Sequence, residues 1–91
     1  MTIWKYRIIE DGISIIRMPL GAEIISTGLD PNGDLCVWAI VDDTADVFEN
    51  VEIRAWGTGW HVDFEGRFIG TVKSGIYMWH VFEVNGRQLI K

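Results

Sequence analysis

The sequence predicts an all-β domain, a small antiparallel sandwich or barrel of about seven to eight strands, built as one domain by residues 1–91. Composition is the first observation: Ile and Val number 21 against 8 for Ala and Leu, and five Thr raise the β-branched total to 26. The second observation is a series of short alternating segments separated by Gly, Asn, Asp and Pro. The third is a pair of apolar runs, 35–41 and 76–84, which are expected to be central strands. A chain of 91 residues has room for one hydrophobic core only.

The first third of the chain predicts three strands. Apolar and polar side chains alternate over residues 3–9 with a period of two, the pattern of a half-buried strand. Turn residues at 10–12 and an apolar run at 13–17 follow, so we expect a β-hairpin here. A proline and a glycine within 18–21 should interrupt pairing before a third strand at 22–29.

The strongest local signal is the segment 30–34, Asp-Pro-Asn-Gly-Asp, which predicts a tight hairpin turn. Its return strand, 35–41, is apolar at every position and should be buried on both faces, with Trp38 in the core. Residues 42–50 contain four carboxylates and no basic residue, and they are expected to form a surface loop.

The second half continues the pattern. Val51, Ile53 and Ala55 alternate with polar or amphipathic residues in a predicted strand at 51–56, which leads into Gly57-Thr58-Gly59. Asn85-Gly86 is expected to form a type I′ turn, and Trp79 to lie in the core. The other expected strand segments are 60–64 (an extension of the preceding strand), 68–72, 76–84 and a short closing strand at 87–91.

Charge, cysteine content and size limit the partners. A net charge of −5 argues against binding to duplex nucleic acid, which relies on a dense Lys and Arg surface. The N-terminus lacks the features of a secretory signal, and no 18-residue apolar run is present, so we expect no membrane partner and a cytoplasmic location. Cys36 has no thiol partner for a disulfide, and a small domain without such staples is expected to form a homo-oligomer.

Several segments resemble a family of short bacteriophage proteins of unknown function. They are Leu35-Cys36-Val37-Trp38-Ala39, Trp79-His80-Val81-Phe82-Glu83 and, less specifically, Ile3-Trp4-Lys5-Tyr6, Met18-Pro19 with Gly21-Ala22, Gly57-Thr58-Gly59 and Phe68-Ile69-Gly70-Thr71-Val72. The resemblance covers most of the chain and departs from the family pattern after Val84. It implies a phage origin and expression in the cytoplasm of an infected bacterium, and it supplies no catalytic residues.

Known catalytic and metal-binding patterns are not found in this sequence. The two histidines, His61 and His80, have no ligand-type spacing, and no serine lies in a nucleophile-elbow motif. Cys36 lies between apolar neighbours, which predicts a buried and inert thiol. We therefore expect a non-enzymatic protein with no catalytic residues, no metal and no cofactor.

Tryptophan carries the functional prediction, because five of 91 residues are Trp. Trp56 and Trp60 flank the Gly-Thr-Gly loop, and a Trp face can stack on a flat ligand. Glycines allow backbone amides to approach an anionic group, and an arginine can bind phosphate through two hydrogen bonds. The predicted ligand-binding cluster is Arg54, Trp56, Thr58, Trp60 and His61.

Two functions follow from these observations. The first is a phage small-molecule binder, a sponge that sequesters a nucleotide-type host immune signal such as a cyclic nucleotide, and so acts against host defence. The alternative is an interaction protein that inhibits a host or phage protein through exposed aromatic side chains and the acidic segment from Asp42 to Glu49. A pocket bounded by Arg54, Trp56 and Trp60 would favour the first, and a flat aromatic patch beside the acidic segment would favour the second.

Overall fold

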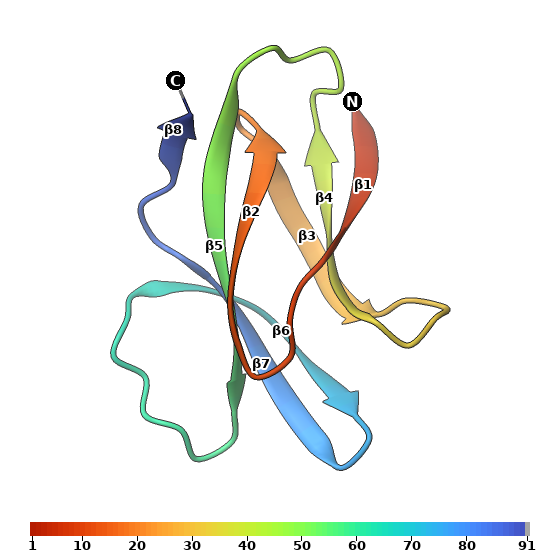
Figure 1. Ribbon diagram of the computed structural model, residues 1–91, viewed down its shortest axis with the longest axis vertical. Coiled ribbons are helices and arrows are strands. Elements are labelled where there is room, and N and C mark those ends of the chain that lie inside the picture. The colour runs from red at the N-terminus through yellow and green to blue at the C-terminus, as the bar shows by residue number, and fades with distance from the viewer. Residues whose placement is uncertain (91) are drawn as a thin grey trace.

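A computed structural model describes residues 1–90 and confirms an all-β sandwich of two antiparallel sheets (Figure 1). The first sheet has the order β1-β4-β3 and the second the order β2-β5-β7-β6, with β8 pairing against β5. The strand bounds are β1 Thr2–Arg7, β2 Gly12–Pro19, β3 Glu23–Leu29, β4 Leu35–Val41, β5 Phe48–Gly57, β6 Gly66–Ser74, β7 Tyr77–Val84 and β8 Gln88–Ile90.

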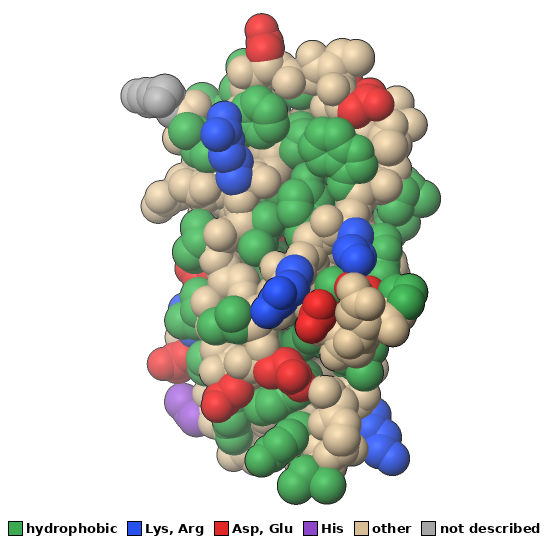
Figure 2. Space-filling model, turned by 45° about the vertical axis from the view of Figure 1, so that its right-hand side comes forward, with side chains coloured by type: hydrophobic (Ala, Val, Ile, Leu, Met, Phe, Trp, Pro, Cys, Tyr) green, Lys and Arg blue, Asp and Glu red, His purple; other side chains and the backbone are tan. Residues whose placement is uncertain are grey.

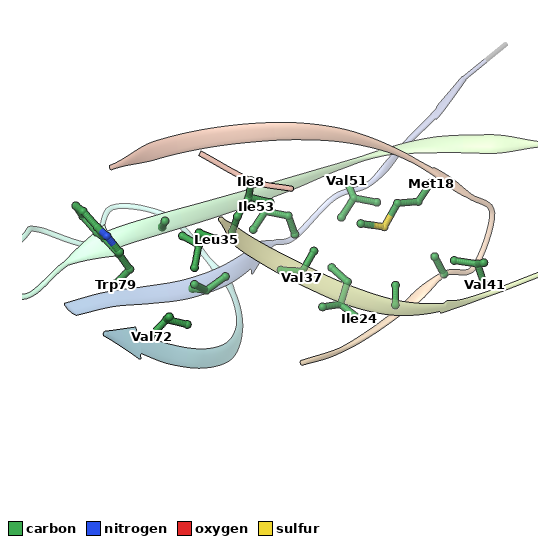
Figure 3. Close-up of a cluster of buried hydrophobic side chains, with 14 residues drawn as sticks. Ile8, Met18, Ile24, Leu35, Val37, Val41, Val51, Ile53, Val72 and Trp79 are labelled. Atoms are coloured by element: carbon green, nitrogen blue, oxygen red, sulfur yellow. The ribbon is translucent and has the colours of Figure 1, made fainter. Parts of the chain in front are cut away.

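The core lies between the two sheets because strand alternation points one set of side chains inward from each (Figure 3). From β4 the inward set includes Val37 and Val41, and from β5 it includes Val51 and Ile53, all fully buried. Trp79 of β7 closes one end of this core with 5% of its surface exposed, as the sequence predicts. At the β3–β6 side the sheets meet, and Arg67 donates a hydrogen bond of 2.8 Å to the Ile24 carbonyl.

The predicted hairpin at 30–34 is confirmed. β3 and β4 pair in register from Leu29 and Leu35, and the Asp30 N–H donates to the Asp34 carbonyl at 2.9 Å. The Asp30 side chain accepts hydrogen bonds from the backbone N–H groups of Asn32 and Asp34 in the turn, and it forms an ion pair of 2.7 Å with Lys5 of β1. These partners, led by Lys5, lower the pKa of the Asp30 carboxyl.

The predicted hairpin between residues 3–9 and 13–17 is wrong. β1 pairs with β4 in one sheet and β2 pairs with β5 in the other, so the turn at 10–12 carries the chain across the sandwich. Asp11 adopts a left-handed conformation with φ of 61°, and the Ile9 N–H donates to Ser14 Oγ at 2.9 Å. A turn signal fixes the reversal but does not determine whether its two arms pair.

Three other predictions, two about strand boundaries and one about pairing, are wrong. β5 begins at Phe48, so Glu49 is not a loop carboxylate: it is buried and pairs with Arg87 at 2.9 Å. Residues 60–64 form a loop and not a strand. After Asn85-Gly86 the chain does not fold back on β7, and β8 instead continues along the same edge of β5.

The predicted core position of Trp38 is also wrong. β4 is central in its sheet and mostly buried, as predicted, but its inward side chains are those of the odd-numbered residues. Trp38 therefore lies on the outward face of the sheet, half-buried against Gly28. A run that is apolar at every position cannot reveal which face points inward.

The second apolar run is not a fully buried strand. The tip of the β6–β7 hairpin extends beyond the ends of β1, β3 and β4 (Figure 1), so no strand of the first sheet covers it. Ile76, Tyr77 and Met78 are 90%, 57% and 43% exposed. This projecting hairpin forms one wall of the candidate site.

Candidate functional site

A groove opens at the end of the sandwich where three segments meet, and we call it the end groove. Its volume is about 570 Å³, within the usual range of small-molecule sites. The three segments are the β1–β2 turn, the end of β5 with the loop after it, and the tip of the β6–β7 hairpin. The lining residues are Glu10 and Asp11, then Gly57, Thr58 and Trp60, then Ile76, Tyr77, Met78 and Trp79.

Trp60 forms the wall on the loop side. The backbone N–H of Trp60 donates a hydrogen bond to the Gly57 carbonyl at 3.1 Å. Gly59, which lies between them, has φ of 89°, so the loop turns back tightly. The Trp60 indole lies directly against Gly57: a Cβ at position 57 would be 2.7 Å from ring atoms Cε2 and Nε1. The ring also packs edge-on against Trp56 and Trp79, with centroid distances of 5.4 and 5.7 Å. These contacts hold Trp60 in place although 42% of it is exposed.

Tyr77 and Trp79 form the opposite wall. Their rings are stacked, 5.5 Å apart and inclined by 20°. The buried Trp79 donates its indole N–H to the Glu10 carboxylate at 2.8 Å, which links the hairpin to the β1–β2 turn. The groove is thus held by contacts between segments that are far apart in the sequence.

Thr58 is held by His80, a histidine that was not predicted to belong to the site. Its hydroxyl lies 2.8 Å from Nε2 of His80, while the hydroxyl of Thr71 lies 3.1 Å from Nδ1. A neutral imidazole has one donor and one acceptor nitrogen, so it can satisfy both hydroxyls. His80 therefore anchors the glycine loop to β7 and β6.

The predicted cluster of Arg54, Trp56, Thr58, Trp60 and His61 is only partly brought together in the groove. Thr58 and Trp60 line it. The other three do not line it: Arg54 and Trp56 lie on the outward face of β5, and the Trp56 indole N–H donates to the His61 carbonyl at 2.9 Å. A binding role for these three stays a prediction.

The Arg54 guanidinium already contacts two carboxylates and two aromatic rings of the same chain. It forms an ion pair of 2.7 Å with Glu52 and a longer one of 3.7 Å with Asp63. Its Cζ lies over the rings of Phe64 and Trp56, at 4.6 and 5.3 Å from their centroids. The two carboxylates offset the positive charge of Arg54, and Nε, one of the donors that a phosphate would use, is hydrogen-bonded to Glu52.

The end groove is acidic. Glu10 and Asp11 line it, and no Lys or Arg appears among its lining residues within the part of the chain that the structure describes. Figure 2 shows acidic side chains next to hydrophobic ones toward the lower end of the molecule, where Figure 1 places the β6–β7 hairpin. This arrangement favours a ligand that is apolar in part and not negatively charged.

Other reactive groups lie apart from the groove. Cys36 is fully buried, and this burial raises the pKa of its thiol, as expected for an unreactive cysteine. Among residues 1–90, no three His, Cys, Asp or Glu side chains are arranged to hold a metal ion. A search of the same residues for a helix long and apolar enough to cross a membrane finds none.

Comparison with known proteins identifies a family but no function. The model of a family described as "Domain of unknown function (DUF7352)" matches residues 1–90. The chain belongs to the DUF7352 family. No curated protein and no solved structure matches it significantly.

Proposed function

We propose that this protein is a non-enzymatic binding protein that holds a small organic ligand in the end groove. The observation that carries the proposal is a groove of about 570 Å³ lined by three aromatic rings from two separate segments. Aromatic rings supply stacking and apolar contact, and a few polar groups orient a ligand, here the Thr58 hydroxyl and the Glu10 carboxylate.

The polar groups beside the groove support binding better than catalysis. Thr58 and His80 are within hydrogen-bond distance, as a nucleophile and its base would be. The second nitrogen of His80, however, faces the Thr71 hydroxyl and not a carboxylate that would stabilise an imidazolium. The three side chains are well suited to holding the loop in one conformation.

The resemblance to short phage proteins supports a role inside an infected bacterium, where such a binder would act as a sponge for a host signalling molecule. The lining is acidic, and Arg54 is paired with Glu52. Both observations argue against a strongly anionic nucleotide as the ligand. We therefore propose sequestration of a small signal or metabolite whose aromatic or alkyl part enters the groove.

A second candidate function is protein interaction, and it rests on a different surface. β2 is an edge strand, and its outward residues Ile13 and Ile15 are 45% and 58% exposed. Exposed apolar side chains on an edge strand favour association, and a second copy of this chain is the partner that the small core suggests. The acidic loop between β4 and β5, residues 42–47, lies at the opposite end of the molecule from the end groove (Figure 1).

Native mass spectrometry of the protein purified from bacterial cells tests the main proposal. We expect a retained small molecule that is absent from the Trp60→Ala variant, because that variant loses one wall of the groove. An Arg54→Gln variant is the control, since Arg54 does not line the groove. If wild-type protein and Trp60→Ala carry the same mass adducts, or if Arg54→Gln alone removes them, the end groove is not the binding site.

A further inference from the structure

We infer that the ligand of the end groove is a small organic cation, of the alkylammonium or quaternary ammonium type. This inference rests on the proposed binding function and specifies the chemical class of its ligand. It depends on three features of the groove within residues 1–90: carboxylates without an ion pair to Lys or Arg, partly exposed aromatic rings, and the absence of a set of ligands suited to a metal ion.

The carboxylates of Glu10 and Asp11 supply the negative charge. Glu10 accepts a hydrogen bond from the neutral indole of Trp79, which orients the carboxylate without neutralising it. Within residues 1–90 neither Glu10 nor Asp11 forms an ion pair with a Lys or Arg side chain. The net charge of −5 adds attraction for a cation at longer range.

The aromatic walls supply the second half of the recognition. Tyr77 stacks on Trp79 yet remains 57% exposed, and Trp60 remains 42% exposed, so both rings offer accessible surface in the groove. The face of an aromatic ring carries a partial negative charge that attracts a cation lying within about 6 Å of its centre. Rings and carboxylates therefore favour the same sign of charge.

Two basic residues are neighbours of residues that line the groove. Lys73 is the register partner of Met78 on the neighbouring strand, and Arg7 lines a smaller hollow of about 210 Å³ that shares Glu10. Neither lines the end groove. Their positive charge would oppose cation binding, so the attraction for a cation must come from the lining residues themselves.

The cation that fits is organic and not a metal ion. Calcium needs six to eight oxygen ligands, whereas the side chains that line the groove offer two carboxylates and the hydroxyls of Thr58 and Tyr77. No group of three His, Cys, Asp or Glu side chains suited to a metal ion is found among residues 1–90. An alkylated ammonium is weakly hydrated and gains from apolar contact, so it suits a groove of this composition.

A matched pair of probes tests the inference: choline and its uncharged isostere 3,3-dimethylbutan-1-ol, titrated to about 10 mM while the indole signals of Trp60 and Trp79 are followed by NMR. We expect choline to bind about two- to five-fold more tightly than the isostere, the size of effect typical of a cation over an exposed aromatic ring. The variant Glu10→Gln/Asp11→Asn should remove this preference. It keeps an oxygen for the Trp79 indole and a residue type that tolerates the left-handed backbone at position 11.

The control variant is Glu23→Gln/Asp46→Asn, which changes the net charge equally at two exposed positions outside the groove. It should retain the preference for choline. Equal or tighter binding of the isostere overturns the inference and leaves the proposed binding function standing, because a ligand would still occupy the groove. A choline preference that survives in Glu10→Gln/Asp11→Asn, or no response to choline, also overturns it.

Discussion

Replacing Gly57 with alanine should damage the end groove without removing any charged or hydrogen-bonding group. The new Cβ would lie 2.7 Å from two atoms of the Trp60 indole and 3.1 Å from a third. The ring cannot simply turn away, because it also packs against Trp56 and Trp79. Overpacking of this kind costs roughly 1–3 kcal/mol, which for a domain of this size lowers the melting temperature by about 4–8 °C for each kcal/mol.

Gly28→Ala is the matched control for that substitution. It adds the same methyl group in another strand, where the nearest atom, Cζ3 of Trp38, is 3.7 Å away in ordinary contact. Its effect should stay within about 0.5 kcal/mol or be slightly stabilising, because alanine restricts the unfolded chain. Thermal unfolding and near-ultraviolet circular dichroism measure both variants. An unchanged melting temperature and aromatic spectrum for Gly57→Ala would show that Trp60 does not lie on Gly57.

Three other predictions concern stability and assembly. Arg87→Gln should destabilise the protein by roughly 2–4 kcal/mol at pH 7, because it leaves the buried Glu49 without its ion pair. Burial raises the pKa of Glu49, but the Gly21 amide and Arg87 outweigh it and lower the pKa, so the wild type loses stability as the pH falls through the folded-state pKa. The variant should lose less on acidification, and chemical denaturation at pH 7 and pH 4 showing an equal penalty would refute this. Thr58→Val should cost about 1 kcal/mol by removing the hydroxyl from His80; an unchanged melting temperature and unchanged His80 ring signals in NMR would contradict that role. Sedimentation at micromolar concentration should show an oligomer, and a single monomeric species would refute the association proposed for β2.

The strands were predictable where one face is polar, and less so where both faces are apolar. In β5 the alternation of Val51, Ile53 and Ala55 with polar neighbours identified the buried face correctly. In β4 and β7 the uniform apolar character predicted burial, but it could not show that Trp38 faces outward or that Tyr77 projects beyond the sandwich. Pairing partners were predictable only for the hairpin at 30–34, where the turn sequence itself specifies the geometry.

The site was partly predictable for a related reason. Thr58 and Trp60 could be predicted as site residues because the Gly-Thr-Gly loop and its flanking tryptophans are continuous in the sequence. Glu10, Tyr77 and Trp79 could not be assigned to the same groove, because only the crossing of the chain between sheets and the length of the β6–β7 hairpin bring them there. The neighbouring Glu52 was a visible signal that Arg54 would be paired and not free for a ligand.

Binding of a small molecule in the end groove can be followed through the NMR signals of the tryptophan indole N–H groups. Titration with a chemically diverse set of small organic fragments, including cations, neutral aromatics and nucleotides, should shift the signals of Trp60 and Trp79, which line the groove. The signals of Trp4 and Trp38, which do not line it, should stay in place. Fragments that shift the signals of Trp38 or Trp4 first, or a set that leaves those of Trp60 and Trp79 unchanged throughout, would contradict ligand binding in the end groove.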